Sequence, residues 1–139
     1  MAMHIDAHQH FWIYNRREYD WIDEAMASIR RDFLPADLKP QLETNGFQGS
    51  VLVQVRQTLE ETRWLLELAE NNPFILGVVG WVDLRSPRLR AELEFFAGLS
   101  EGAIGEFSVS GPRSARHRIS DDPIENRRGS RWHVGARGS

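Results

Sequence analysis

The chain of 139 residues contains no cysteine, which excludes both disulfide bonds and thiolate metal sites and fits a reducing compartment. It also lacks an apolar run long enough to span a bilayer. No basic stretch followed by an apolar block marks a signal peptide at the N-terminus. There is no excess of basic residues, since the formal net charge is −3 and the pI about 5.9. We therefore expect a cytoplasmic protein with no membrane or nucleic-acid partner.

Apolar runs that alternate with amphipathic segments dominate the first hundred residues. They predict strands over 3–10, 51–55 and 74–82, and helices over 35–44, 58–71 and 86–98. Thr58 and Glu61 are spaced as a capping box, and Ser86 is placed to cap the third helix. Pro40 either kinks the first helix or moves its start toward Asp37. Strands and helices in this alternation predict an α/β fold with parallel strands joined by right-handed crossovers.

The segment 11–33 is a long connection rich in aromatic and charged residues. Such connections inside a domain are usually either functional or disordered, and so much aromatic surface argues against disorder. Residues 23–30 are expected to form a short helix within it. The rings either cap the core or contact a ligand.

The composition changes near residue 99. Residues 100–139 contain seven Arg and five acidic residues, with few periodic apolar positions. A short strand is predicted over 103–109, and the remainder is predicted to be a disordered, solvated tail. Binding of nucleic acid or an acidic partner by this tail is the weaker alternative.

The opening stretch Met3–Trp12 contains the motif His8-Gln9-His10. Residues i and i+2 of a strand share a face, so the two imidazoles are expected to project side by side and to hold one divalent metal ion, with zinc the first choice. Asp6 is expected to fix the orientation of a metal-binding histidine. The alternative is that two exposed imidazoles occur together by chance.

Polar and aromatic residues follow the predicted strands at their carboxyl ends, where parallel sheets bind ligands. Gln54 and Arg56 lie at the carboxyl end of the second strand, and Arg56 can hold a carboxylate or sugar hydroxyls through its fork of donors. Trp12 and Trp81 can pack on a sugar-like ring. The alternatives are a surface salt bridge for Arg56 and core packing for each Trp.

Six blocks in order resemble the amidohydrolase superfamily, in particular the amidohydrolase-related group of predicted metal-dependent hydrolases that includes sugar-acid lactonases such as fuconolactonase. They are Ile5–Trp12, Tyr19–Ile22, Arg31–Leu38, Val51–Gln57, Glu61–Leu66 and Gly77–Leu84. The resemblance implies a (β/α)8 TIM barrel, with His8 and His10 at its catalytic end. It also implies hydrolysis of a lactone ring, in which a metal polarises the carbonyl or activates water and a carboxylate from the last strand acts as base.

The resemblance covers only the first three to four βα units of a barrel that typically has about 250 residues. The family's later metal ligands and catalytic carboxylate have no counterpart here, so the catalytic residue is unknown. His117 and His133 lie in the tail and are not assigned as ligands. We expect residues 1–99 to form the N-terminal portion of such a barrel, in a chain truncated or frame-shifted near Leu99.

Two main hypotheses about function follow. The first is a lactonase-type hydrolase that acts on a small lactone or sugar acid and is inactive if the site is incomplete. The second is a non-catalytic α/β domain that binds a ligand or partner at the same strand ends. In either case, a partial barrel leaves two open sheet edges, and this favours self-association.

Overall fold

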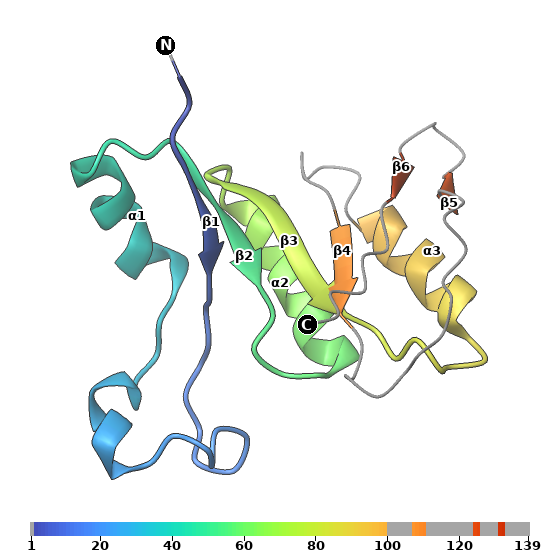
Figure 1. The fold of residues 1–139 in the computed structure, drawn as a ribbon, viewed down its shortest axis with the longest axis horizontal. Coiled ribbons are helices and arrows are strands. Elements are labelled where there is room, and N and C mark those ends of the chain that lie inside the picture. Colours follow the sequence, from blue (N-terminus) through green and yellow to red (C-terminus); the bar gives the residue numbers. More distant parts are fainter. Residues whose placement is uncertain (1, 100–106, 111–123, 126–130, 133–139) are drawn as a thin grey trace.

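A parallel sheet forms the centre of the protein in a computed structural model that describes residues 2–99 and the backbone of 107–110, 124–125 and 131–132 (Figure 1). The sheet has the strand order β1-β2-β3-β4. Its strands are β1 (Ile5–Gln9), β2 (Gly49–Val53), β3 (Ile75–Trp81) and β4 (Phe107–Ser110). All neighbouring strands run parallel, as predicted from the alternation of apolar runs and helices.

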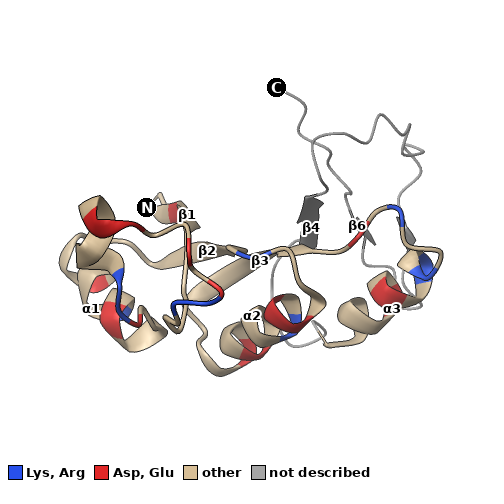
Figure 2. Cartoon of the chain, turned by 90° about the horizontal axis from the view of Figure 1, so that it is seen from below, with Lys and Arg blue, Asp and Glu red and all other residues tan. Residues whose placement is uncertain are grey.

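The three main helices also form where the sequence predicts them. They are α1 (Pro35–Thr44), α2 (Leu59–Asn71) and α3 (Leu89–Leu99). Figure 2 views the sheet edge-on, with α1, α2 and α3 on the same side of it. All three helices carry both acidic and basic residues (Figure 2), and two i,i+4 ion pairs, Lys39–Glu43 and Arg90–Glu94, lie on their surface.

The start of α1 agrees with the predicted range, whereas the first turns of α2 and α3 differ from the predictions. Helix α1 begins at Pro35, so Pro40 does not move its start. Thr58 caps α2 by accepting a hydrogen bond from the Glu61 N–H, but the Glu61 carboxylate turns away from Thr58, so only half of the capping box forms. Helix α3 begins at Leu89 rather than beside Ser86, since Ser86 and the following residues form a turn in which Ser86 Oγ accepts from the Arg88 N–H.

The core lies between the sheet and helices α2 and α3. Leu52 and Leu65 are fully buried, and Val78 and Phe96 are 3% exposed. Helix α2 is fixed to the end of β3 by Thr62, whose hydroxyl accepts a hydrogen bond from the Trp81 N–H and donates one to the Trp81 carbonyl, at 2.8 and 2.7 Å. The sheet face that carries Leu52 and Val78 is therefore the one that the helices cover.

The connection between β1 and α1 is ordered, as its aromatic content suggests. Trp12 and Phe33 close its base through a backbone bridge with N···O distances of 3.0 and 2.9 Å. Tyr19 and Ile22 are buried within it, and the short helix predicted over 23–30 is the 3₁₀ helix η1 (Glu24–Ile29). The rings thus extend the core beyond the sheet.

The predicted strand near residues 103–109 corresponds to β4. An antiparallel pair, β5 (Ile124–Glu125) and β6 (Arg131–Trp132), lies further along the chain. The remaining positions of 100–139, including His117 and His133, lie outside the described residues, so the predicted disorder of this tail remains a prediction. Across the described part of the chain, none of the helices has the length and apolarity needed to cross a membrane.

Candidate functional site

The two histidines of the opening motif converge at the carboxyl end of β1. Nε2 of His8 lies 3.2 Å from Nε2 of His10, and the ring centroids are 4.9 Å apart. Gln9, between them, pairs with Leu52 of the covered sheet face. Because side chains alternate along a strand, His8 and His10 lie on the opposite face, together with Val53, Val79 and Trp81.

A backbone carbonyl determines which nitrogen of His10 carries the proton. Nδ1 of His10 lies 2.8 Å from the carbonyl oxygen of Val53, which can only accept a hydrogen bond. Nδ1 therefore donates, and in the neutral ring Nε2 keeps its lone pair free for a metal or for the N–H of His8. No local sequence pattern indicates this contact, because it depends on the register of β1 against β2.

The spacing of the two imidazoles fits a shared metal ion. Two tetrahedral Zn–N bonds of 2.0–2.1 Å place their nitrogens about 3.3 Å apart, close to the 3.2 Å between His8 Nε2 and His10 Nε2. Within the described residues, no cluster of three or more His, Asp or Glu side chains is arranged to hold a metal. The pair would therefore supply two ligands of a larger set.

Asp6 does not contact either imidazole in the way its spacing suggests. Its Oδ1 accepts a hydrogen bond from the backbone N–H of His8 at 3.2 Å. The carboxylate thus fixes the backbone at the motif, where the β1–β2 register is irregular, rather than the ring. Ring orientation comes instead from the Val53 carbonyl.

Arg56 lies where β2 leads into α2, and it has acidic partners. Its NH1 is 2.7 Å from Glu18 Oε1, its Nε is 3.8 Å from Glu61 Oε1, and its guanidinium lies over the Tyr19 ring at 5.8 Å. Gln54, two residues earlier, donates its backbone N–H to the Val79 carbonyl at 2.8 Å. Arg56 therefore joins the β2–α2 loop to the β1–α1 connection.

Glu61 is the buried partner of Arg56, although its spacing from Thr58 predicts only a helix cap. It is 1% exposed, and its Oε2 accepts hydrogen bonds from the N–H groups of Val55 and Arg56 at 3.1 and 2.7 Å. Burial raises the pKa of the Glu61 carboxyl above its ordinary value, against the two N–H groups and the charge of Arg56. Burial likewise raises the pKa of the Tyr19 phenol. In the sequence, the contact between Glu61 and Arg56 is indicated only by the presence of an acidic residue five positions after the arginine.

The two tryptophans proposed for substrate contact are partly buried at different places. Trp12 packs against Phe33, with ring centroids 4.7 Å apart, at the base of the β1–α1 connection. Trp81 ends β3 on the sheet face of His8 and His10. The indole N–H of each is buried without a hydrogen-bond partner in the structure. Both rings therefore combine packing with an unused donor.

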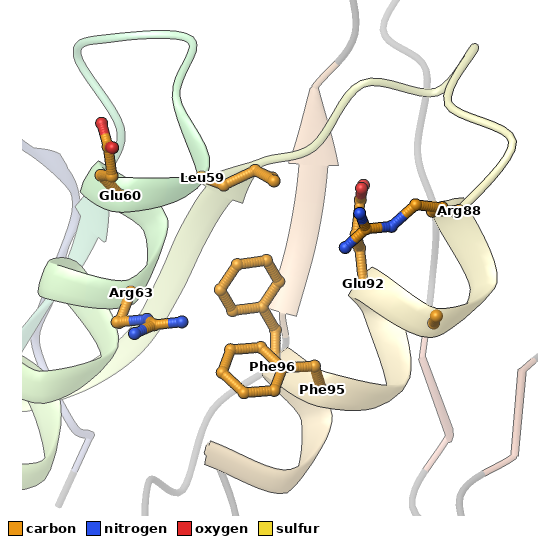
Figure 3. Close-up of a pocket in the computed structure, with 8 residues that line it drawn as sticks. Leu59, Glu60, Arg63, Arg88, Glu92, Phe95 and Phe96 are labelled. Atoms are coloured by element: carbon orange, nitrogen blue, oxygen red, sulfur yellow. The ribbon is translucent and has the colours of Figure 1, made fainter.

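A groove of about 610 Å³ lies elsewhere, between helices α2 and α3 (Figure 3). Phe95 and Phe96 point into it, and the guanidinium of Arg63 lies over the Phe95 ring at 5.0 Å. Both helices cover the sheet face opposite His8 and His10. The groove is therefore separate from the candidate site.

Known proteins resemble this chain in sequence, although no family model matches it. L-fucono-1,5-lactonase of Burkholderia multivorans (strain ATCC 17616 / 249) is 37% identical over 121 residues, which are 87% of this chain and 37% of that protein. L-fucono-1,5-lactonase of Burkholderia ambifaria (strain ATCC BAA-244 / DSM 16087 / CCUG 44356 / LMG 19182 / AMMD) is 44% identical over 97 residues, or 70% of this chain and 33% of that protein. The chain thus spans about a third of the length of these relatives.

Solved structures agree with the sequence comparison. Two crystal structures of an amidohydrolase from Burkholderia multivorans, one with bound HEPES and one with bound zinc, superpose with a TM-score of 0.69 at 39% identity. The match covers 77% of this chain and 36% and 37% of those chains. The parallel βα units described above are therefore part of a TIM-barrel-like amidohydrolase fold, as predicted. Over the portion that it covers, the chain is thus an amidohydrolase-superfamily protein that is similar to L-fucono-1,5-lactonases.

Proposed function

We propose that the chain is part of a hydrolase that opens sugar-acid lactones, with L-fucono-1,5-lactone as the first substrate to test. The observation that carries the proposal is the His8–His10 pair, with Nε2 atoms 3.2 Å apart at the carboxyl end of β1, in a chain similar to L-fucono-1,5-lactonases. Ligands of parallel βα folds bind at this end of the strands.

His8 and His10 would hold a divalent metal, for which zinc is proposed because a similar amidohydrolase structure contains it. Such an ion polarises a lactone carbonyl or activates water. The protein's own contribution is to present the free lone pair of His10 Nε2, since the Val53 carbonyl retains the proton on Nδ1. A base is not assigned, because within the described residues no carboxylate joins the two imidazoles in a metal cluster.

Substrate contacts are proposed for Trp12, Gln54, Arg56 and Trp81. The buried indole N–H groups of Trp12 and Trp81 lack a partner in the structure and would gain one from a sugar hydroxyl. Arg56 would face a hydroxyl or carboxylate while it retains Glu18 as an ion-pair partner. A polyhydroxylated ring, apolar on its faces and polar at its edge, suits this combination.

The test is hydrolysis of L-fucono-1,5-lactone, followed by proton release and corrected for the spontaneous rate, with and without added Zn²⁺. We expect turnover that His8→Ala and His10→Ala abolish. His4→Ala, at the exposed position just before β1, is the matched control and should retain the rate. No turnover above background by folded wild-type protein would refute the hydrolase proposal.

One observation favours binding without catalysis as a second candidate. Among the described residues, the two imidazoles have no third metal-ligating side chain beside them. Under this alternative, the chain binds L-fuconate or its lactone in isothermal titration calorimetry and hydrolyses neither. Weakening of that binding by Arg56→Ala or Trp81→Ala would place the ligand at the same strand ends.

A further inference from the structure

Three acidic and basic side chains from different parts of the chain form a continuous series beside the carboxyl ends of β1 and β2. Glu61 lies on the first turn of α2, Arg56 on the β2–α2 loop and Glu18 on the β1–α1 connection. Exposure rises along the series: the side chains of Glu61, Arg56 and Glu18 are 0%, 23% and 47% exposed. The series therefore runs from the core to the surface.

The inner end of the series is fixed by the backbone. One carboxylate oxygen of Glu61 accepts two hydrogen bonds, from the consecutive N–H groups of Val55 and Arg56, and the other faces the Arg56 guanidinium. A single carboxylate therefore sets both the backbone position of Arg56 and the direction of its side chain. A hydrogen bond to an ionised carboxylate is roughly twice as strong as one between two neutral groups.

The outer end is fixed by a turn in the β1–α1 connection. Asn15 Oδ1 accepts hydrogen bonds from the N–H groups of Arg17 and Glu18, and the Asn15 carbonyl accepts one from the Tyr19 N–H. This turn presents the Glu18 carboxylate and the Tyr19 ring to the same guanidinium. Arg56 is thus the only member of the series that contacts both the connection and Glu61.

We propose that Glu61 is a positioning residue that, through Arg56, holds the β1–α1 connection against the carboxyl end of the sheet as one wall of the ligand site. The inference deepens the proposed lactonase function, since it assigns the support of Arg56 in that same site. Glu61 itself contacts the loop backbone and Arg56, so its effect on a ligand passes through Arg56.

Limited trypsin proteolysis tests the proposal without any need for turnover. Arg16 and Arg17 are exposed on the connection beside Glu18, and Arg90 is exposed on α3, away from the series. We expect Glu61→Ala to raise cleavage after Arg16 and Arg17 about tenfold at constant cleavage after Arg90, since cleavage follows the population of the locally opened form. Glu61→Gln, which retains one acceptor oxygen, should give a smaller increase.

The matched control is Glu60→Gln, which removes an exposed charge from the adjacent position of the same helix and should leave cleavage unchanged. Glu18→Gln removes the outer ion pair and the charge that accepts a hydrogen bond from Asn15 Nδ2, while Glu61 is unchanged. It therefore tests the series if Glu61→Ala fails to fold, and about a threefold increase after Arg16 and Arg17 is expected. Cleavage there within twofold of wild type in Glu18→Gln and Glu61→Gln, or an equal increase after Arg90, would overturn the proposal.

The kinetic test separates this inference from the proposed function. If the wild-type chain hydrolyses the lactone, Glu61→Gln should raise KM with kcat nearly unchanged, because a misdirected Arg56 weakens ground-state and transition-state binding alike. Loss of kcat with unchanged KM would contradict positioning through Arg56. If the wild type hydrolyses nothing, the lactonase proposal fails, and the proteolysis pattern alone decides the role of Glu61.

Discussion

At the scale of single residues, some contacts of the candidate site can be predicted from a local sequence pattern and others cannot. The His8–His10 pair follows from strand alternation alone, and the structure brings the two rings together. The Val53 carbonyl and the burial of Glu61 do not follow from any local pattern. Both depend on which strand lies beside which, and that information is spread over the whole chain.

The first prediction concerns metal binding by the histidine pair. His10→Ala should weaken Zn²⁺ binding by about tenfold or more, because it removes one of two converging imidazoles and leaves the other without its neighbour. Isothermal titration calorimetry measures this affinity directly. His4→Ala should bind as wild type, and an equal loss in both variants would show that zinc binds outside the motif.

The second prediction concerns pH and Glu61. Burial raises the pKa of this carboxyl in the folded protein, so its stabilising contribution is complete below the ordinary pKa of 4.5 and is lost as pH rises through the raised value. Glu61→Gln cannot ionise, although Arg56, Glu18 and Tyr19 still surround the position. The variant should therefore gain stability relative to wild type as pH rises from 4.5 through the raised folded-state pKa, and the difference should stay constant above it.

Urea denaturation of both proteins across this pH range measures the difference. A constant difference would mean that Glu61 titrates alike in the folded and unfolded states. Ionisation of Glu61 lowers the stability of the fold, but the resulting carboxylate is the charged partner of Arg56. The trend would therefore show that positioning Arg56 costs stability.

At the scale of elements, strands and helices were predictable, whereas their ends were less so. Apolar runs and amphipathic periods are properties of many residues, and they place β2, β3, α1 and α2 close to their observed bounds. The start of α3 depends on a turn at Ser86, and the cap of α2 depends on whether Glu61 faces Thr58 or the preceding loop. A few hydrogen bonds decide such choices.

The third prediction compares two glycines in different elements. A Cβ at Gly49, the first residue of β2, would lie 2.5 Å from Leu76 Cδ1 and 2.7 Å from the Phe74 carbonyl oxygen. Gly49→Ala should therefore destabilise the protein by about 1–3 kcal/mol through overpacking. Gly98→Ala in α3 has open space and should stabilise it by about 0.5–1 kcal/mol.

Thermal or urea unfolding of both variants checks this pair. Equal and small effects would mean that β3 can shift away from β2 without cost. Gly49 also illustrates what the sequence leaves out, since the need for a glycine there arises from Leu76 on the neighbouring strand.

At the scale of the whole molecule, the described sheet has β1 at one edge and a face without helices. Met3 and Ile5 of the opening segment are 64% and 40% exposed, although their alternation marks them as an apolar face. Alternation along an extended segment predicts only that these two residues share a face. It could not predict their exposure, which depends on what packs beside β1.

The fourth prediction is self-association through this edge. Wild-type protein should show concentration-dependent association in sedimentation velocity, because an exposed edge strand with apolar side chains offers backbone groups to another chain. Ile5→Lys should reduce it by placing a charge on the edge strand. Leu59→Lys, on the exposed first turn of α2, is the control and should associate as wild type. Association that Ile5→Lys leaves unchanged would indicate another interface.

The chain between β1 and β2 also determines the order in which the site assembles. Residues 10–48 must close before β1 can pair with β2, whereas β2, α2 and β3 follow one another along the chain. Strand docking by β1 is therefore expected to be a late step in folding, and its release an early step in unfolding. His10 reaches Val53 only while β1 is docked. Amide hydrogen exchange should accordingly be faster in β1 than in β2 and β3, and the histidine pair should form and separate while the core beneath it stays folded.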